Sequence, residues 1–335
     1  MSLETSIKRK LQSSAAKVEG FIDKLLVPNK PEEVYHAAHH LIKAGGKRLR
    51  PYMVLKSCEL IGGDPELALP YATAMEMFHT FTLIHDDIMD NDKLRRGSPT
   101  VHTKWGIPLA IVSGDLLFAK VYSAMLKPGK SGKISNERIV SCIESLTNAA
   151  IILSEGQALD SLQSNVRDVS EEDYIYMVGS KTSALFRTCA EIGCLVGGGS
   201  EEEVTRLGSF AWDAGIAFQI VDDILGVTAD EATLGKPVGS DVREGKKTLI
   251  SIKALEDASP EERETLEKAL GVHDASMSDI DEAMKVLAST GAIAYAEKVA
   301  EEYTEKAMNA IATFPDSEAK RDLLELVEYF TKRSY

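Results

Sequence analysis

The stretch "ALPYATAMEMFHTFTLIHDDIMDND", residues 68–92, decides the fold class. Drawn as a helix, it carries apolar side chains nearly all the way round, which is typical of a central helix enclosed by others. Residues 138–162 have the same character. Strand signals are scarce along the rest of the chain. We therefore expect an all-α protein, a helical bundle with these two stretches in its core.

The C-terminal third carries further helix signals. Residues 259–262 combine a Ser N-cap, a Pro at N1 and a Glu at N3, the pattern of a capping box. Ser278 is expected to begin the next helix, which runs to Gly291. Residues 317–335 then place apolar side chains on one face of a last amphipathic helix.

Length and composition favour one globular domain over residues 1–335. Hydrophobic residues make up 44% of the chain, enough for a large core. No run of eighteen apolar residues predicts a membrane span, and the N-terminus lacks the apolar stretch of a secretory signal. We expect a cytoplasmic protein whose four cysteines are reduced. The net charge of −14 argues against nucleic acid as a partner.

Three carboxylates end the first apolar stretch. In a helix, Asp86 and Asp90 lie about 40° apart around the axis, and Asp87 flanks them. Like charges this close favour a bound cation, and oxygen donors alone favour Mg²⁺, or Mn²⁺, over zinc. A solvated acidic helix end is the alternative interpretation of this motif taken alone.

A second acidic motif strengthens the metal interpretation. The sequence "FQIVDDILG" ends another apolar helix with Asp222 and Asp223, and Gln219 precedes them by one turn. Gly226 stands where a third Asp would complete the repeat, which weakens the ligand set. Asp160, in "SEGQALDSLQ", also ends an apolar stretch, although alone it could be an ordinary solvated residue.

Basic residues accompany the acidic motifs in three loops rich in glycine. Guanidinium groups bind phosphate oxygens bidentately, and glycine allows backbone to approach an anion closely. In a chain of net charge −14, these clusters point to a bound diphosphate and its metal ions. The basic residues are Lys47, Arg48 and Arg50, then Arg95 and Arg96, then Lys236, Lys246 and Lys247.

These motifs resemble those of the trans-isoprenyl diphosphate synthases, the head-to-tail prenyltransferases. The match includes "GGKRLRP", "HTFTLIHDDIMDNDKLRRGSPTVH", "GDLL", "EGQALD", "KTSALF", "FQIVDDILG" and "GKPVGSD", and so covers nearly the whole chain. The resemblance implies a helical bundle around a deep central cavity, a homodimer, and three magnesium ions per active site.

The resemblance also implies a role for each matching residue. Asp86, Asp90, Asp160 and Asp222 would bind magnesium, with Asp87 and Asp223 beside them. Arg95, Lys181, Lys236 and Lys246 would bind the allylic diphosphate. Gly46, Lys47, Arg50, His79 and Arg96 would form the isopentenyl diphosphate site. Thr182 and Gln219 would face the reacting allylic carbons.

The chemistry of such a reaction suits these side chains. Cleavage of an allylic C–O bond leaves a carbocation and a diphosphate, so metal ions, Arg and Lys stabilise the leaving group. The double bond of isopentenyl diphosphate attacks the cation and a proton is then lost, which the resemblance assigns to the departing diphosphate as base. We therefore assign no general base to His79 or His85.

Bulk in the helix before the first acidic motif is expected to limit product length. Phe81 precedes Asp86 by five residues, about 7.5 Å along the axis, and Phe78 precedes it by eight, about 12 Å. The helical angle does not decide between Phe78, Phe81 and Thr82, and Phe78 could be ordinary core. By resemblance, Phe81 followed by Thr82 predicts geranylgeranyl diphosphate (C20), with farnesyl diphosphate (C15) or a mixture as the alternative.

Two other functions fit the motifs less well. A class I terpene cyclase also uses DDxxD, but "DDILGVTADE" does not reproduce the second motif of that class. A non-catalytic subunit that tunes a partner synthase would be expected to lose its metal ligands, whereas this chain keeps nearly all of them. We therefore predict a catalyst that acts on small-molecule isoprenyl diphosphates.

Overall fold

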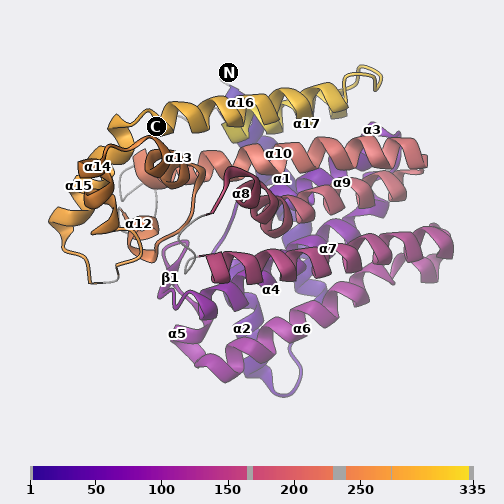
Figure 1. The fold of residues 1–335 in the computed structure, drawn as a ribbon. Coiled ribbons are helices and arrows are strands. Elements are labelled where there is room, and N and C mark those ends of the chain that lie inside the picture. Colours follow the sequence, from indigo (N-terminus) through magenta and orange to yellow (C-terminus); the bar gives the residue numbers. More distant parts are fainter. Residues whose placement is uncertain (1–2, 164–168, 229–238, 273, 332–335) are drawn as a thin grey trace. The chain divides into compact units, whose positions relative to one another are not determined.

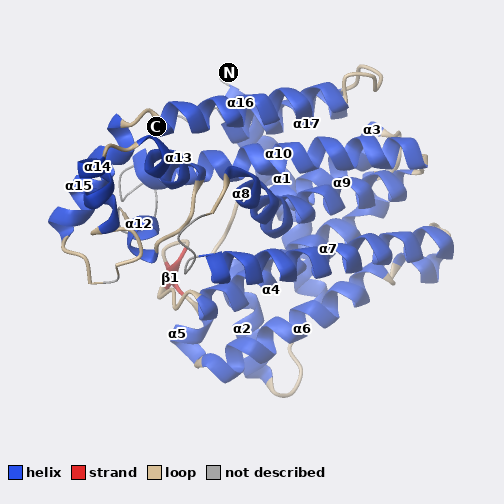
Figure 2. Cartoon of the chain, viewed as in Figure 1, coloured by secondary structure: helices blue, strands red, loops and turns tan. Residues whose placement is uncertain are grey.

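The computed structural model describes residues 3–163, 169–228, 239–272 and 274–331. Helices dominate this part of the chain, and the all-α prediction is confirmed (Figure 2). The described residues contain one two-stranded antiparallel hairpin, β1 (Leu94–Arg95) with β2 (Ser98–Pro99). Contacts between Cα atoms group the chain into two compact units, and the single domain over residues 1–335 stays a prediction.

Unit 1 comprises residues 1–147, 188–208 and 314–325. Helix α4 packs against α6, α3 and α1, and α2 packs against α6. Helix α5 also contacts α6, α4 and α2 (Figure 1). The unit contains the hairpin and the helices α1 (Leu3–Leu25), α2 (Glu32–Lys43), α3 (Leu49–Leu60), α4 (Pro65–Met89), α5 (Val101–Trp105), α6 (Ile107–Met125) and the 3-10 helix Pro128–Ser131.

Unit 2 comprises residues 148–187, 209–313 and 326–335. Its core is built around α13 and α16, with Ile250, Leu266 and Leu287 among its buried side chains. It contains α8 (Glu171–Val178), a π-helix (Gly179–Ser183), α12 (Ser240–Glu244), α13 (Leu249–Asp257), α14 (Pro260–Glu267), α15 (Met277–Ser289) and α16 (Ala292–Ala310). Both units include parts of α7 (Asn136–Gln163), α9 (Ala184–Gly197), α10 (Glu201–Thr228) and α17 (Glu318–Thr331).

Local capping explains where several helices begin. The capping box before α14 is confirmed: Ser259 accepts from the Glu262 N–H, and the Glu262 side chain accepts from the Ser259 N–H. The predicted start at Ser278 is wrong, because Ser276 is the N-cap of α15 and forms its own capping box with Asp279. An acidic residue three positions on is what makes Ser276 the better cap.

The two apolar helices differ in burial. Most of α4 is buried, as expected, whereas α7 carries exposed Val140 (52%), Ile151 (53%) and Leu162 (65%). Within this single chain α7 is therefore only partly covered. By length and composition alone, α6 and residues 136–162 of α7 could cross a membrane. The sequence predicted no span because it has no eighteen consecutive apolar residues. Two such helices are weak evidence, since core helices of soluble proteins pass the same test.

Candidate active site

The C-terminal end of α4 carries the first acidic motif. Asp86 is half-buried, and Asp90 is the exposed C-cap residue, one helical turn further on. Asp87 is fully buried and points elsewhere: its Oδ1 accepts from Nε of Arg95, and its Oδ2 makes no hydrogen bond. Burial raises the pKa of Asp87 to about 6, although Arg95 lowers it. Asp87 therefore anchors Arg95, while Asp86 and Asp90 are the carboxylates toward solvent.

The hairpin after α4 positions the two arginines. Arg96 adopts a left-handed backbone conformation with φ 54°, and Gly97 follows with φ 72°. This turn places the Arg95 guanidinium beside two carboxylates. Its Nε donates to Asp87, and its Nη2 donates to Oδ2 of Asp92 at 3.2 Å. Arg96 instead donates to the carbonyl oxygen of Gly45, in the loop after α2. Adjacent arginines thus serve separate clusters.

Arg48 holds the basic loop between α2 and α3. Its guanidinium is buried and donates to Ile42 O (2.6 Å) and Gly45 O (2.9 Å). It also pairs with the carboxylates of Glu76 (2.7 Å) and Glu19 (2.9 Å). Arg48 is therefore structural, and it shapes the loop that presents exposed Lys47.

Glycine is required at position 46. Its φ is +139°, and a Cβ there would lie 2.8 Å from the guanidinium groups of both Arg48 and Arg96. Any side chain would therefore push apart the two arginines that meet at this loop. The predicted placement of Gly46 beside basic residues agrees with this packing, and its role in substrate binding remains a prediction.

His79 orients Arg50. Nη1 of Arg50 lies 3.2 Å from Nε2 of His79. Burial and the positive charges of Arg50 and Arg96 hold the pKa of His79 well below its ordinary value. The neutral ring accepts the hydrogen bond from Arg50, which is a positioning role and not that of a proton carrier. Unit 1 thus gathers Lys47, Arg50 and Arg96 around the loop between α2 and α3.

An aromatic cluster lies between α4 and α6. The Phe81 ring centroid lies 5.5 Å from that of Phe78, 5.2 Å from that of Phe118 and 4.8 Å from that of His85. Phe78 is buried, whereas Phe81 and Phe118 are half-buried. Thr82 donates its hydroxyl to His79 O and takes no part in the cluster. Sequence reasoning missed Phe118, although "GDLLF" places it one turn after Gly114.

Gly114 lets α4 and α6 approach closely. A Cβ at this position would lie 2.4 Å from Nε2 of His85, which in turn contacts Ile111 O at 3.2 Å. His85 therefore packs against the helix backbone of α6. This close approach is what brings Phe118 against Phe81.

Unit 2 contains a hydrogen-bonded chain around the second acidic motif. Thr182, in the π-helix, donates to Oε1 of Gln219 (3.0 Å), and Nε2 of Gln219 donates to Oδ1 of Asp223 (3.0 Å). The Tyr174 hydroxyl donates to Oδ2 of Asp223 (2.6 Å). Both oxygens of Asp223 are thus engaged, so Asp222 is the motif's better candidate for a metal ligand. Sequence reasoning missed Tyr174.

These contacts also explain the pKa of Asp223. Burial raises it to about 7, although the hydrogen bonds from Tyr174 and Gln219 lower it. Tyr174 holds the Asp223 carboxylate in place, and the hydrogen bond from Gln219 to that carboxylate fixes which way the Gln219 amide points. The hydroxyl oxygen of Thr182 keeps lone pairs for another partner.

The π-helix also positions Lys181. Its Nζ lies 2.5 Å from Oδ2 of Asp160 on α7. The two backbones come close because Gly156 has no side chain: a Cβ there would lie 2.5 Å from the Lys181 nitrogen. Lys181 and Asp160, predicted for the diphosphate and the metal respectively, are therefore brought together.

Another carboxylate occupies the space beside Gly226, the position of the missing third Asp. A Cβ on Gly226 would lie 2.6 Å from Oδ2 of Asp241, so the glycine leaves room for this carboxylate. Lys246 lies 3.2 Å from Asp241 and 2.9 Å from Glu244. Lys236 lies outside the described residues. Sequence reasoning missed the position of Asp241 beside this motif, because "GSD" entered only as part of the family resemblance.

The donor sets fit magnesium. Among the residues that the structure describes, no three His, Cys, Asp or Glu side chains form a closed metal site. Mg²⁺ characteristically uses one or two carboxylates together with substrate phosphates and water, so two carboxylates such as those of Asp86 and Asp90 suffice. The four predicted metal ligands are all carboxylates, and their role stays a prediction.

Known proteins identify the family. The model of the polyprenyl synthetase family matches residues 31–287. This chain belongs to the polyprenyl synthetase family. It is a prenyltransferase with a helical fold, as its sequence motifs predicted.

This chain resembles polyprenyl synthetases that differ from one another in product. A geranylgeranyl diphosphate synthase of Sulfolobus acidocaldarius is 44% identical over 83% of this chain and 84% of its own. A geranylfarnesyl diphosphate synthase of Aeropyrum pernix is 41% identical over 90% of this chain and 95% of its own. The chain is therefore a short-chain trans-prenyl diphosphate synthase, and identity alone does not give its product.

Solved polyprenyl synthetases share the fold. A geranylgeranyl pyrophosphate synthetase from Pyrococcus horikoshii has a TM-score of 0.92 and 39% identity, covering 99% of this chain and all of its own. A polyprenyl synthase from Caulobacter crescentus, solved with calcium and isoprenyl diphosphate, has a TM-score of 0.89 and 31% identity, with 99% and 98% covered. The family is metal-dependent.

Proposed function

We propose that this chain is a Mg²⁺-dependent geranylgeranyl diphosphate synthase that adds isopentenyl diphosphate to dimethylallyl, geranyl and farnesyl diphosphates. The observation that supports it is the pairing on α4 of a carboxylate end, Asp86 and Asp90, with the aromatic cluster one to two turns earlier. The carboxylates suit the charged head of the substrate, and the cluster suits the limit of its apolar tail.

Isopentenyl diphosphate is assigned to the basic cluster of unit 1. Arg50 and Arg96 offer guanidinium forks, and Lys47 offers an ammonium group on the loop that Arg48 shapes. Because His79 is neutral and accepts from Arg50, it leaves the positive charge of this cluster undiminished. The cluster therefore binds the diphosphate without supplying an acid or a base.

The allylic diphosphate is assigned to Asp86 and Asp90 through magnesium, and to Arg95 and Lys181 directly. Magnesium bound there would neutralise charge on the leaving diphosphate. Family resemblance implies three ions, and Mn²⁺ could take their place. Asp160 and Asp222 are the further ligands proposed. Lys236 and Lys246 are proposed to bind the same diphosphate.

Thr182 and Gln219 are proposed to face the allylic carbons when the C–O bond breaks. Their oxygens carry partial negative charge, which stabilises a developing carbocation without forming a bond to it. The hydrogen bonds that end at Asp223 and Tyr174 hold both side chains in place beforehand. Isopentenyl diphosphate then attacks, and the released diphosphate takes the proton.

The aromatic cluster is proposed to set the C20 length. Phe81 lies about 7.5 Å along the helix axis from Asp86, and Phe118 adds bulk from α6 at the same level. Thr82 has its hydroxyl on the backbone and gives little obstruction. Farnesyl diphosphate, or a C15 and C20 mixture, is the alternative product.

The test is incubation of the enzyme with labelled isopentenyl diphosphate and each allylic diphosphate, with and without Mg²⁺, followed by chain-length analysis. We expect metal-dependent elongation that ends at C20. Lack of any elongation would refute the synthase assignment, whereas C15 or C25 as the main product would refute the length alone. A homodimer in the cytoplasm is the proposed working state.

A further inference from the structure

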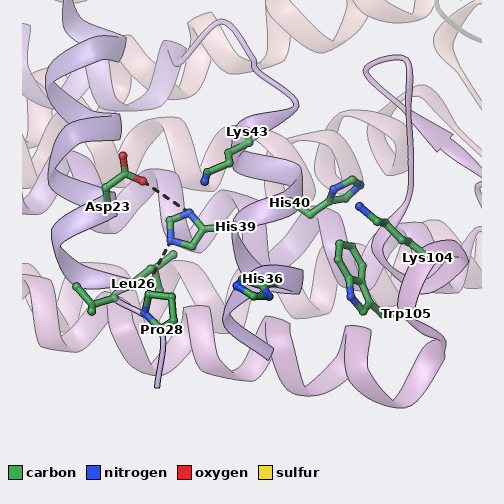
Figure 3. Close-up of a pocket in the computed structure, with 10 residues that line it drawn as sticks. Asp23, Leu26, Pro28, His36, His39, His40, Lys43, Lys104 and Trp105 are labelled. Atoms are coloured by element: carbon green, nitrogen blue, oxygen red, sulfur yellow. Dashed lines mark hydrogen bonds and ion pairs between the residues drawn. The ribbon is translucent and has the colours of Figure 1, made fainter. Parts of the chain in front are cut away.

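A pocket of about 580 Å³ lies in unit 1 among α1, α2 and α5 (Figure 3). None of its lining residues belongs to the candidate active site. Helix α2 contributes His36, His39, His40 and Lys43, and the pocket is completed by the end of α1 with the residues after it, and by α5. Its size is typical of small-molecule sites. We call it the α1–α2–α5 pocket.

The charge of this pocket favours an anion. Lys43 and Lys104 both line it, and among the described residues no carboxylate lies within 4.0 Å of either ammonium group. Lys104 is held against the Trp105 ring, 4.4 Å from its centroid. Asp23, 66% exposed in its side chain, is the sole acidic residue among those that line the pocket. Two uncompensated ammonium groups are notable on a chain of net charge −14.

His39 lies beside the single carboxylate among the described residues that line the pocket. Its Nε2 donates to Leu26 O at 3.2 Å, so Nδ1 carries the lone pair. That Nδ1 is buried and makes no hydrogen bond, and it lies 3.8 Å from Oδ1 of Asp23 (Figure 3). Burial lowers the pKa of His39, which keeps the ring neutral. The exposed Asp23 carboxylate beside this neutral ring can accept hydrogen bonds from hydroxyl groups.

Metal binding is a poorer explanation of the histidines. His36 and His40 are four residues apart on α2, a spacing that can hold a metal. However, Nε2 of His40 is engaged by Pro99 O at 2.7 Å, and its ring packs edge-on to Trp105. Figure 3 shows His36 and His40 directed apart. An organic anion therefore fits better than a metal ion.

We propose that the α1–α2–α5 pocket binds a small polyol phosphate. The hydroxyl groups donate to the two oxygens of the Asp23 carboxylate, beside the His39 ring. The phosphate lies at Lys43, one helical turn from His39 on the same face of α2. Lys104 adds a second positive charge, and Trp105 forms the opposite wall.

The test is a titration of protein labelled with ¹⁵N-histidine, followed by the ring signals of His39 and His36. Glycerol 3-phosphate is the probe, and inorganic phosphate and glycerol are its two halves. We expect saturable shifts at His39, with the ester binding about tenfold more tightly than phosphate because of two added hydrogen bonds. The signal of His79 separately reports phosphate bound at the active-site cluster.

Two matched variants decide whether the site is specific. Lys43→Gln is expected to weaken ester binding about fivefold, as for loss of one exposed charge contact. Lys24→Gln removes an equal charge from an exposed residue of α1 that does not line the pocket, and it should leave binding unchanged. Equal weakening by both variants, no shift at His39, or equal affinity for phosphate and ester would overturn the proposal.

Discussion

Removing Arg48 should damage both stability and the binding of one substrate. The side chain is fully buried and makes five hydrogen bonds, two to backbone carbonyls and three to the carboxylates of Glu19 and Glu76. Arg48→Ala would leave Glu76, 2% exposed, without its hydrogen-bonded cation. Breaking a buried pair in this way costs about 3–5 kcal/mol. We expect a loss of that size in the free energy of unfolding.

The same change should act selectively on catalysis. Arg48 binds Ile42 O, in the last turn of α2, and Gly45 O, in the loop that leads to Lys47. Without this anchor the loop loses its fixed shape, so the KM for isopentenyl diphosphate should rise at least about tenfold, the equivalent of one lost charge-assisted hydrogen bond. The KM for the allylic diphosphate should change little.

The measurements are urea unfolding followed by circular dichroism and steady-state kinetics with each substrate varied in turn. Arg9→Ala, at an exposed position of α1, is the matched control and should be neutral. Arg48→Lys should recover little, because an ammonium group cannot make five hydrogen bonds in a planar fork. Arg48→Met combined with Glu76→Leu should be less destabilising than the sum of the single changes.

Two results would refute this reasoning. An Arg48→Ala protein that unfolds at the same urea concentration as the parent would show that the buried pair contributes nothing net. Equal increases in both KM values would show that Arg48 does not act through the loop before Lys47.

Three further predictions follow from the candidate active site. Phe81→Ser and Phe118→Ala should each extend the products by at least one C5 unit, as measured by chain-length analysis, because each removes a ring from the cluster; unchanged products would exclude that ring as the limit. Tyr174→Phe should lower kcat about tenfold and leave both KM values nearly unchanged, since it removes one hydrogen bond to a carboxylate that fixes Gln219; an unaltered kcat would show that Gln219 needs no such support. Asp86→Asn should lower kcat at least a hundredfold, and chelation should abolish turnover of the parent until Mg²⁺ is restored; activity retained in chelator would remove metal from the mechanism.

Much of the fold was readable because it depends on local signals. The capping box at Ser259 and the apolar face of the last helix were both found where expected. The error at Ser278 shows the limit of this reading, since two serines, Ser276 and Ser278, lie two residues apart and both precede acidic residues. An apolar composition does not say which neighbours cover a helix, and α7 keeps several apolar side chains exposed within this single chain.

The supporting residues of the site were less readable. The sequence placed Arg48 among the cations of the basic loop, and its five internal hydrogen bonds show that it holds the loop in shape. Phe118 and Tyr174 lie far from the motifs in sequence, and their roles come from contacts with Phe81 and Asp223. Gly226 looked like a defect in the second motif, whereas it makes room for Asp241.

The sequence by itself determined the helical fold class, the family and the residues that carry charge to the ends of α4 and α10. It could do so because periodicity, capping and motif spacing act over a few residues and are written directly in the chain. Only the tertiary structure decided which charges neutralise one another, as Arg48 does with Glu76, and which remain for substrates. That division depends on side chains brought together from distant segments, where burial sets the strength of each pair.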